Sequence, residues 1–271
     1  MSSSIGTLGI LVQNAAYAVI VPLYLIIYLS TSPLISSQKV SNYLVDAADI
    51  AAIPISMALG YVVSSILMSL PAPSVIKFEQ KQIFIAIWQM FPLWVAVLQT
   101  ILPYLVVRTT KGQLMTPSEV RGHELRSLRR LYTILLIVAG IGQVSTFTLL
   151  ATPTWFPGLF TSEYTGVFKP SNVFVPTAVS PSTKMPSTGA GAHLLLQYDE
   201  FIGSTSMALF TTVLYINIYR ISKVYSNFTY QVMHGIAALV LTGPLGYAVA
   251  CMWARDELIA AEDLEGVKKS K

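Results

Sequence analysis

The sequence predicts an all-α fold, a polytopic transmembrane helical bundle of about six spans, from three observations. Of the 271 residues, 54% are hydrophobic and only 11% are charged, whereas about 25% of the residues in a typical soluble domain are charged. The mean hydropathy is +0.61. Apolar stretches of about 20 residues recur, which is the length that a membrane-crossing helix needs. Such stretches are too long for barrel strands, and this composition excludes a soluble enzyme.

Six stretches have this length and composition, and a seventh, re-entrant element is left open. They cover residues 8–29, 50–70, 83–107, 131–152, 201–219 and 232–253. We expect Pro92 and Pro103 to kink the third span, because proline removes a backbone N–H group. We predict one transmembrane domain over residues 1–254, including a long proline-rich loop at 153–198, followed by a polar, solvated tail at 255–271.

The distribution of cations predicts the orientation of the chain. The loop between the third and fourth spans contains six of them: Arg108, Lys111, Arg121, Arg126, Arg129 and Arg130. Cytoplasmic loops collect Lys and Arg, so this loop is predicted to be cytoplasmic and the long loop to be non-cytoplasmic. The net charge of +4 then requires no nucleic-acid partner. The first cation is Lys39, so we expect no cleavable signal peptide. We also expect an integral membrane protein of the endoplasmic reticulum.

Four acidic residues stand at the mouths of predicted spans. Asp46 and Asp49 precede the second span, and Asp199 and Glu200 precede the fifth. An ionisable group at membrane depth usually faces a cavity or a partner, and a carboxylic acid in such a place can serve as a proton donor. The alternative interpretation is that these carboxylates cap helix N-termini.

Two stripes of residues at helical spacing accompany these acids. On the fifth span, the face that begins at Asp199 continues through Gly203, Ser206 and Phe210. The third span contributes Gln89, Pro92, Ala96, Gln99 and Pro103, with both carboxamides expected on one face, and the rings of Trp88, Phe91 and Trp94 nearby. Aromatic rings can stabilise a cation within about 6 Å. The alternative is interfacial anchoring and ordinary helix packing.

The pattern of possible metal ligands predicts no metal site. The three histidines, His123, His193 and His234, lie on three different segments. Magnesium-dependent diphosphate chemistry normally needs two facing clusters of carboxylates. The pair Asp46 and Asp49 forms one DxxD motif and has no second such motif to face.

Several short motifs occur between about residues 30 and 220. They are Ile53-Pro54-Ile55-Ser56, Leu59-Gly60-Tyr61-Val62, Leu70-Pro71-Ala72-Pro73-Ser74, Lys81-Gln82, Trp88-Gln89-Met90-Phe91-Pro92-Leu93-Trp94, Gln197-Tyr198-Asp199 and Gly203-Ser204. Together these motifs resemble those of fungal integral-membrane terpene cyclases of the kind that act in ascochlorin and ascofuranone biosynthesis.

The resemblance implies a class II cyclisation without metal or cofactor. A carboxylic acid protonates the terminal epoxide of a prenylated phenol, and the chain closes through carbocations in an apolar, water-poor site. Asp199 is the expected acid, with Asp46 or Asp49 as a second carboxyl and Glu200 as a further candidate. The candidate substrate-binding residues are Tyr61, Trp88, Gln89, Phe91, Trp94, Gln99, Tyr198, Ser206 and Phe210. The expected partners are this hydrophobic, epoxidised prenyl phenol and the lipid bilayer.

Three other functions remain open at this point. A small-molecule or proton-coupled transporter would use the same intramembrane acids, although the sequence has no internal repeat of the kind that many transporters show. An intramembrane prenyltransferase of the Asp-rich type would need a second Asp cluster and magnesium. A non-enzymatic scaffold would use the basic loop at 108–130 to bind acidic lipid headgroups.

Overall fold

The computed structural model describes residues 2–32, 46–110, 117–161, 166–180, 184–221 and 228–269, and every regular element within these ranges is helical. The all-α prediction is therefore confirmed for this part of the chain. Lys39 and Lys111, which entered the prediction of orientation, lie outside the described residues. The chain divides into two compact units, residues 1–15 with 41–134 and residues 16–40 with 135–271.

Four helical segments within the described ranges are long and apolar enough to cross a membrane: Ala47–Ser69, Glu119–Trp155, Thr188–Arg220 and Thr229–Ala261. A bent pair of helices makes a fifth if it is counted as one span. The predicted spans from the second to the sixth thus correspond to apolar helices, but the predicted count of six or seven is not confirmed.

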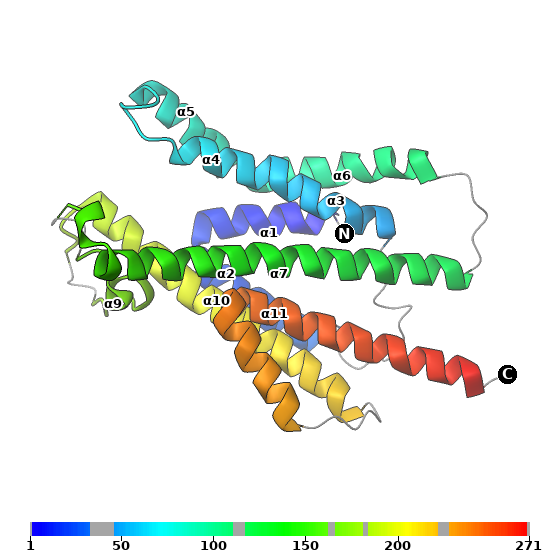
Figure 1. Cartoon of the computed structure of the whole chain (residues 1–271). Coiled ribbons are helices and arrows are strands. Elements are labelled where there is room, and N and C mark those ends of the chain that lie inside the picture. The colour runs from blue at the N-terminus through cyan, green and yellow to red at the C-terminus, as the bar shows by residue number, and fades with distance from the viewer. Residues whose placement is uncertain are drawn as a thin grey trace. The chain divides into compact units, whose positions relative to one another are not determined.

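The first unit is built around the continuous apolar helical segment Ala47–Ser69 and a pair of helices that meet at a bend. Its elements are α1 (Ser2–Ala15), α3 (Ala47–Met57), the π-helical turn η3 (Ala58–Val62), α4 (Val63–Ser69), α5 (Phe78–Gln89), α6 (Phe91–Thr110) and the first part of α7 (Pro117–Trp155). Helices α5 and α6 meet at an angle of 55° (Figure 1). Pro92, at the start of α6, cannot donate a backbone hydrogen bond to the preceding turn, which explains the break at Met90.

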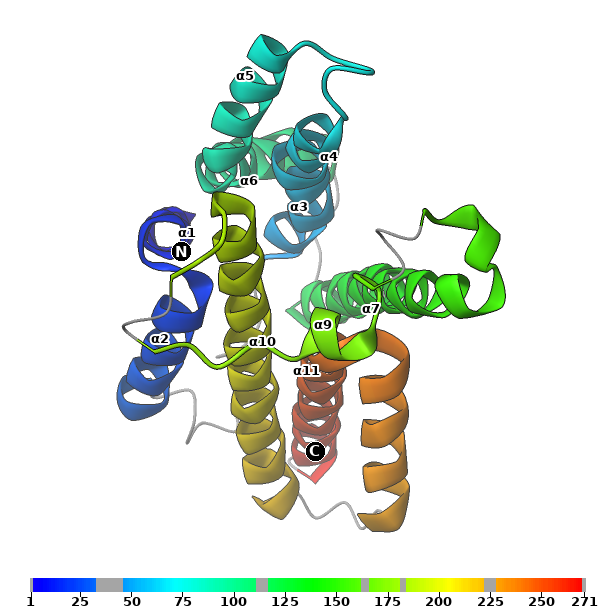
Figure 2. The ribbon, with the colours of Figure 1, turned by 90° about the vertical axis from the view of Figure 1, so that its left-hand side faces the viewer.

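The second unit packs α10 against two neighbours. Its elements are α2 (Tyr17–Thr31), the remainder of α7, the 3₁₀ turn η4 (Pro157–Leu159), α9 (Pro170–Phe174), α10 (Thr188–Ile221) and α11 (Phe228–Lys269). Helix α10 runs beside both α2 and α11 (Figure 2). Polar side chains join α10 to α11, because Thr212 Oγ1 lies 2.9 Å from the hydroxyl of Tyr247 and the Tyr215 hydroxyl donates to Gln231 Oε1 at 2.7 Å.

The last predicted span is sharply bent in its middle. Helix α11 turns at Gly243 (Figure 1), whose φ of 70° lies in the left-handed region that glycine adopts without steric cost. Pro244 follows directly and cannot continue the ladder of hydrogen bonds. The helix then continues to Lys269, and Arg255, Ile259 and Ala260 are buried. The expected solvated tail therefore begins as a packed part of α11.

The first predicted span is wrong as a single helix. Residues 8–29 are divided at Ala16, which has a φ of 72°, into α1 of the first unit and α2 of the second. No glycine or proline marks this position, so local sequence gave no warning. Contacts of Tyr17 and Ala18 with α10, described below, favour the break instead.

The long loop is shorter than predicted, because α10 begins at Thr188 rather than near residue 201. The Ser187 hydroxyl accepts a hydrogen bond from the backbone N–H of Ala190 at 3.1 Å, which is the contact of a helix N-cap. The small residues after Ser187 thus form the first turn of the helix and not the end of a loop. The described part of the connection contains η4 and α9.

Candidate active site

Asp199 lies well inside α10, so it does not cap its own helix. Its Oδ1 atom accepts a hydrogen bond from the backbone N–H of Ala18 at 2.9 Å. Ala18 is in the first turn of α2, where backbone N–H groups have no partner within their own helix. The carboxyl of Asp199 is half-buried. Asp199 is therefore both a helix cap and a candidate acid, and the helix that it caps is α2 rather than its own.

Tyr17 brings an aromatic ring beside this carboxyl. Gly203, one turn after Asp199 on α10, is buried, and a Cβ atom at this position would overlap the ring of Tyr17. Glu200 itself is exposed. Of the two predicted acids on α10, Asp199 is the one held inside the unit.

A pair of rings lies further along the contact between α2 and α10. The rings of Tyr28 and Phe210 meet edge to face with centroids 5.6 Å apart, and Tyr24 lies 6.2 Å from Tyr28. Phe210 is about 16 Å from Asp199 along the α10 axis at 1.5 Å per residue. Sequence reasoning found Phe210 but missed Tyr17, Tyr24 and Tyr28. The spacings of seven and four between these tyrosines, which place them on one helical face, were the available signal.

The other predicted α10 residues make local contacts. The Ser206 hydroxyl donates to the Ile202 carbonyl within the helix at 2.7 Å. The Tyr198 hydroxyl donates to the carbonyl of Thr177 at 3.1 Å, and the neighbouring Gln197 amide donates to α9. The connection between α7 and α10 is therefore fastened to α10 immediately before Asp199.

The acids of the first unit stand at the start of α3. Asp46 is the N-cap of this helix, and its Oδ1 atom accepts from the backbone N–H of Ala48 at 2.8 Å. Asp49 lies in the first turn and is exposed. The capping interpretation thus describes Asp46. Gln99 of α6 binds this region, because its Nε2 donates to the Asp49 carbonyl at 2.7 Å and its Oε1 accepts from the Ser56 hydroxyl at 2.8 Å.

Three predicted substrate residues of the first unit form one aromatic cluster. The rings of Tyr61 and Phe91 have centroids 4.8 Å apart, and Trp88 lies 5.9 Å from Phe91. The Trp88 indole N–H donates to the Ser65 hydroxyl at 3.0 Å. Tyr61 belongs to η3, and single π-helical turns inside α-helices occur frequently at functional sites. These contacts fix the three rings at the junction of η3, α5 and α6.

Two members of the predicted stripe on the third span do not share a face as expected. The break at Met90 places Gln89 at the end of α5, where it is exposed, whereas Gln99 lies on α6 and binds α3. The expectation failed because it assumed one uninterrupted helix. Trp94 is 40% exposed and donates its indole N–H to the Ile87 carbonyl at 3.0 Å.

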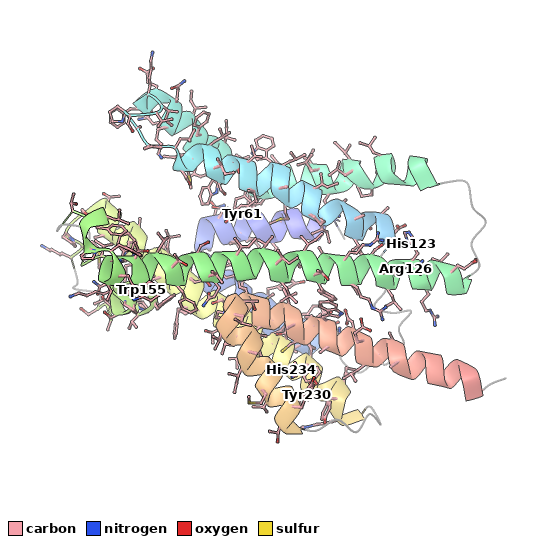
Figure 3. All side chains as sticks on the ribbon, viewed as in Figure 1. Tyr61, His123, Arg126, Trp155, Tyr230 and His234 are labelled. Atoms are coloured by element: carbon pink, nitrogen blue, oxygen red, sulfur yellow. The ribbon has the colours of Figure 1, made fainter. Side chains whose placement is uncertain are left out.

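The histidines of the described segments do not gather into a metal site. His234 lies against Tyr230 on α11 (Figure 3), with ring centroids 3.9 Å apart. His123 is on α7 and His193 on α10. Within the described ranges, no group of three or more His, Cys, Asp and Glu side chains is arranged to hold a metal ion.

Together, these features define the class as a helical protein with helices long and apolar enough to cross a membrane, with an acid beside an aromatic ring in the second unit and an aromatic cluster in the first. The chain belongs to the family described as the CtvD domain, which matches residues 2–260. It is similar to terpene cyclase ascI of Acremonium egyptiacum, with 27% identity over 99% of this chain and 67% of the relative. Terpene cyclase sdgD of Emericella nidulans is 27% identical over 93% of this chain and 62% of the relative.

A third relative is terpene cyclase ctvD of Aspergillus terreus, which is 26% identical over 92% of this chain and 66% of its own length. The resemblance to fungal terpene cyclases that the motifs indicated is confirmed. The chain spans between half and about two thirds of the length of the curated relatives that it matches. No solved structure matches the chain.

Proposed function

We propose that this chain is a membrane-bound class II terpene cyclase that acts on the terminal epoxide of a prenylated, farnesyl-type phenol. Its similarity to named terpene cyclases extends over nearly its whole length. The structural observation that carries the proposal is the half-buried Asp199 carboxyl, hydrogen-bonded on one oxygen and adjacent to an aromatic ring. A hydrophobic substrate is compatible with apolar helices. We further propose that the enzyme lies in the endoplasmic reticulum membrane.

Asp199 acts in this proposal as the general acid. A protonated carboxyl accepts hydrogen bonds through one oxygen and donates through the other, so the Ala18 N–H on Oδ1 leaves Oδ2 to carry the proton. Transfer of this proton to the epoxide oxygen breaks a C–O bond and leaves a carbocation. Alkene π electrons then form the ring bonds, and loss of one proton from the last cation ends the reaction. The product is an isomer of the substrate.

The aromatic rings stabilise the intermediate cations in this scheme. An aromatic face attracts a cation within about 6 Å of its centroid, and a ring offers no lone pair as basic as that of water. Each unit contains one candidate lining of its own: the pair of Tyr28 and Phe210 in the second unit, and the cluster of Tyr61, Trp88 and Phe91 in the first. Asp49, in the first turn of α3, is the proposed second carboxyl, with Asp46, which caps the same helix through one oxygen, as the alternative.

The test is conversion of an epoxyfarnesyl phenol by microsomes that contain the full chain. We expect a cyclised product of unchanged mass, detected by mass spectrometry, without added metal. Asp199→Asn should abolish the conversion while the protein remains inserted. Glu79→Gln, which neutralises an exposed carboxylate at the start of α5, is the matched control and should retain activity. Absence of isomerisation across a panel of prenyl-phenol epoxides would overturn the cyclase proposal.

A further inference from the structure

We infer that Tyr17 and Gly203 are positioning residues for Asp199. In this arrangement, contact between the Tyr17 ring and Gly203 fixes the N-terminus of α2 so that the Ala18 N–H meets the Asp199 carboxylate. The catalytic consequence rests on the proposed function, but the positioning itself is a property of the second unit and has its own measurement.

The first observation concerns the distance between α2 and α10. Gly203 follows Asp199 by one helical turn, so both lie on the same face of α10. Gly203 is buried, and any Cβ at this position would overlap the Tyr17 ring. The ring thus lies directly on the α10 backbone, one turn from the carboxyl. Glycine is required here for close approach rather than for backbone flexibility.

The second observation concerns the turn that brings α2 to this place. Ala16 has φ 72° and ψ 147°, and a positive φ is uncommon for a residue with a Cβ atom. Such a conformation persists where the surrounding contacts hold it. The next two residues provide these contacts, because Tyr17 touches Gly203 and Ala18 donates to Asp199. Three consecutive residues therefore act together: Ala16 breaks the helix, and Tyr17 and Ala18 attach α2 to α10.

The attachments have a consequence for acid catalysis. A hydrogen bond to Oδ1 restricts rotation of the Asp199 carboxyl, so Oδ2 keeps one orientation. Misplacement of a reacting group by about 1 Å can lower a rate on the order of 100-fold. Loss of the Tyr17–Gly203 contact is therefore expected to lower kcat of the folded enzyme about 10- to 100-fold, with KM unchanged because the substrate-lining rings remain.

Two variants break the contact from opposite sides. Gly203→Ala introduces the Cβ that overlaps the ring, and Tyr17→Ala removes the ring. Each has a matched control. Gly142→Ala adds a Cβ that meets no atom within 4 Å apart from the adjoining backbone of its own helix, and Val19→Ala truncates a neighbouring α2 side chain that is 50% exposed. Tyr17→Phe retains the ring and should restore the behaviour that Tyr17→Ala loses.

The direct measurement is hydrogen exchange of the Ala18 amide in the full chain, in detergent or nanodiscs, by mass spectrometry. We expect at least tenfold faster exchange in Gly203→Ala and Tyr17→Ala, with protection retained in both controls and in Tyr17→Phe. Unchanged exchange in Tyr17→Ala would overturn the positioning role, even if Gly203→Ala failed to fold. Faster exchange with unchanged kcat per folded molecule would establish the positioning and refute Asp199 as the acid.

Discussion

The carboxylate of Asp199 accepts a hydrogen bond from the backbone N–H of Ala18 at 2.9 Å, although the two residues are 181 positions apart in the chain. The bond joins the middle of α10 to the first turn of α2. It satisfies one of the N–H groups that a helix leaves unpaired at its start. It also holds in one orientation the carboxyl that we propose as the acid. Stability therefore depends on the ability of the Asp199 side chain to accept a hydrogen bond, and the proposed activity depends on its ability to donate a proton.

Two replacements of Asp199 separate these properties. Asn keeps an oxygen that can accept from Ala18, whereas Ala removes the acceptor. Loss of a helix N-terminal cap costs about 1 kcal/mol, so Asp199→Ala should lower the thermal unfolding midpoint and Asp199→Asn should leave it nearly unchanged. Both should lose cyclisation, because neither can donate an acidic proton. An inactive Ala variant with unaltered unfolding would contradict the capping role.

Asp46 and Asp49 offer the corresponding comparison in the first unit. The Asp46 carboxylate caps α3 through Ala48, and Asp49 is exposed. Asp46→Ala should lower stability by about 1 kcal/mol, because the Ala48 N–H loses its acceptor, and Asp46→Asn should largely restore it. Asp49→Asn should leave the unfolding midpoint unchanged and lower turnover, since Asp49 is the proposed second carboxyl. Full turnover in Asp49→Asn would refute that assignment.

The helical class could be predicted from the sequence, but the exact breaks and ends of the helices could not. The apolar stretches gave the helical class, because an apolar run of sufficient length satisfies its backbone only as a helix in lipid. The same reasoning missed the break at Ala16 and the early start of α10. A Cβ-bearing residue at positive φ is held by Tyr17 and Ala18 through contacts with α10, and no window of local sequence contains such contacts.

The spacing of the residues predicted part of the geometry around the candidate site. Asp199, Gly203 and Phe210 do share a face, and the motif around Trp88 does bring rings together with Tyr61. Spacing failed at Gln89, because Met90 and the following proline bend the chain by 55°. Pairing of α10 with α2 was not predictable, since it depends on a partner helix 181 residues distant in sequence.

Gln99 connects α6 to α3 through two hydrogen bonds, to Ser56 and to the Asp49 carbonyl. Gln99→Leu has a similar shape but leaves both partners without this contact. A typical hydrogen bond contributes about 0.5–1.5 kcal/mol to stability, so the variant should unfold at a lower temperature. Val97→Ala, at a position 44% exposed on the same helix, is the control. Equal unfolding of the two variants would show that the link contributes no stability.

The bend of α11 makes Gly243 sensitive to substitution by any residue with a Cβ atom. Its φ of 70° is unfavourable for any residue with a Cβ, and a Cβ there would lie 2.9 Å from Gln143 Oε1 of α7. Backbone strain of this kind costs about 1–3 kcal/mol, so Gly243→Ala should lower the unfolding midpoint. Gln143→Ala in the same chain should recover the part caused by the clash and leave the part caused by φ. Gly142→Ala, which meets no atom apart from the adjoining backbone of its own helix, should unfold like the unaltered protein, and equal loss in both glycine variants would refute the strain.

The edge-to-face pair of Tyr28 and Phe210 provides the last prediction. Its centroids are 5.6 Å apart, and such pairs contribute about 0.5–1.5 kcal/mol beyond the area that they bury. Phe210→Leu keeps an apolar side chain but removes the ring and its attraction for a cation. We expect slower turnover together with partly cyclised products that end at an earlier carbocation, detectable by chromatography and mass spectrometry. Leu209→Ala, at a neighbouring position 63% exposed, should leave the product profile unaltered. A lower amount of folded protein with an unchanged product profile in Phe210→Leu would show that the pair serves packing alone.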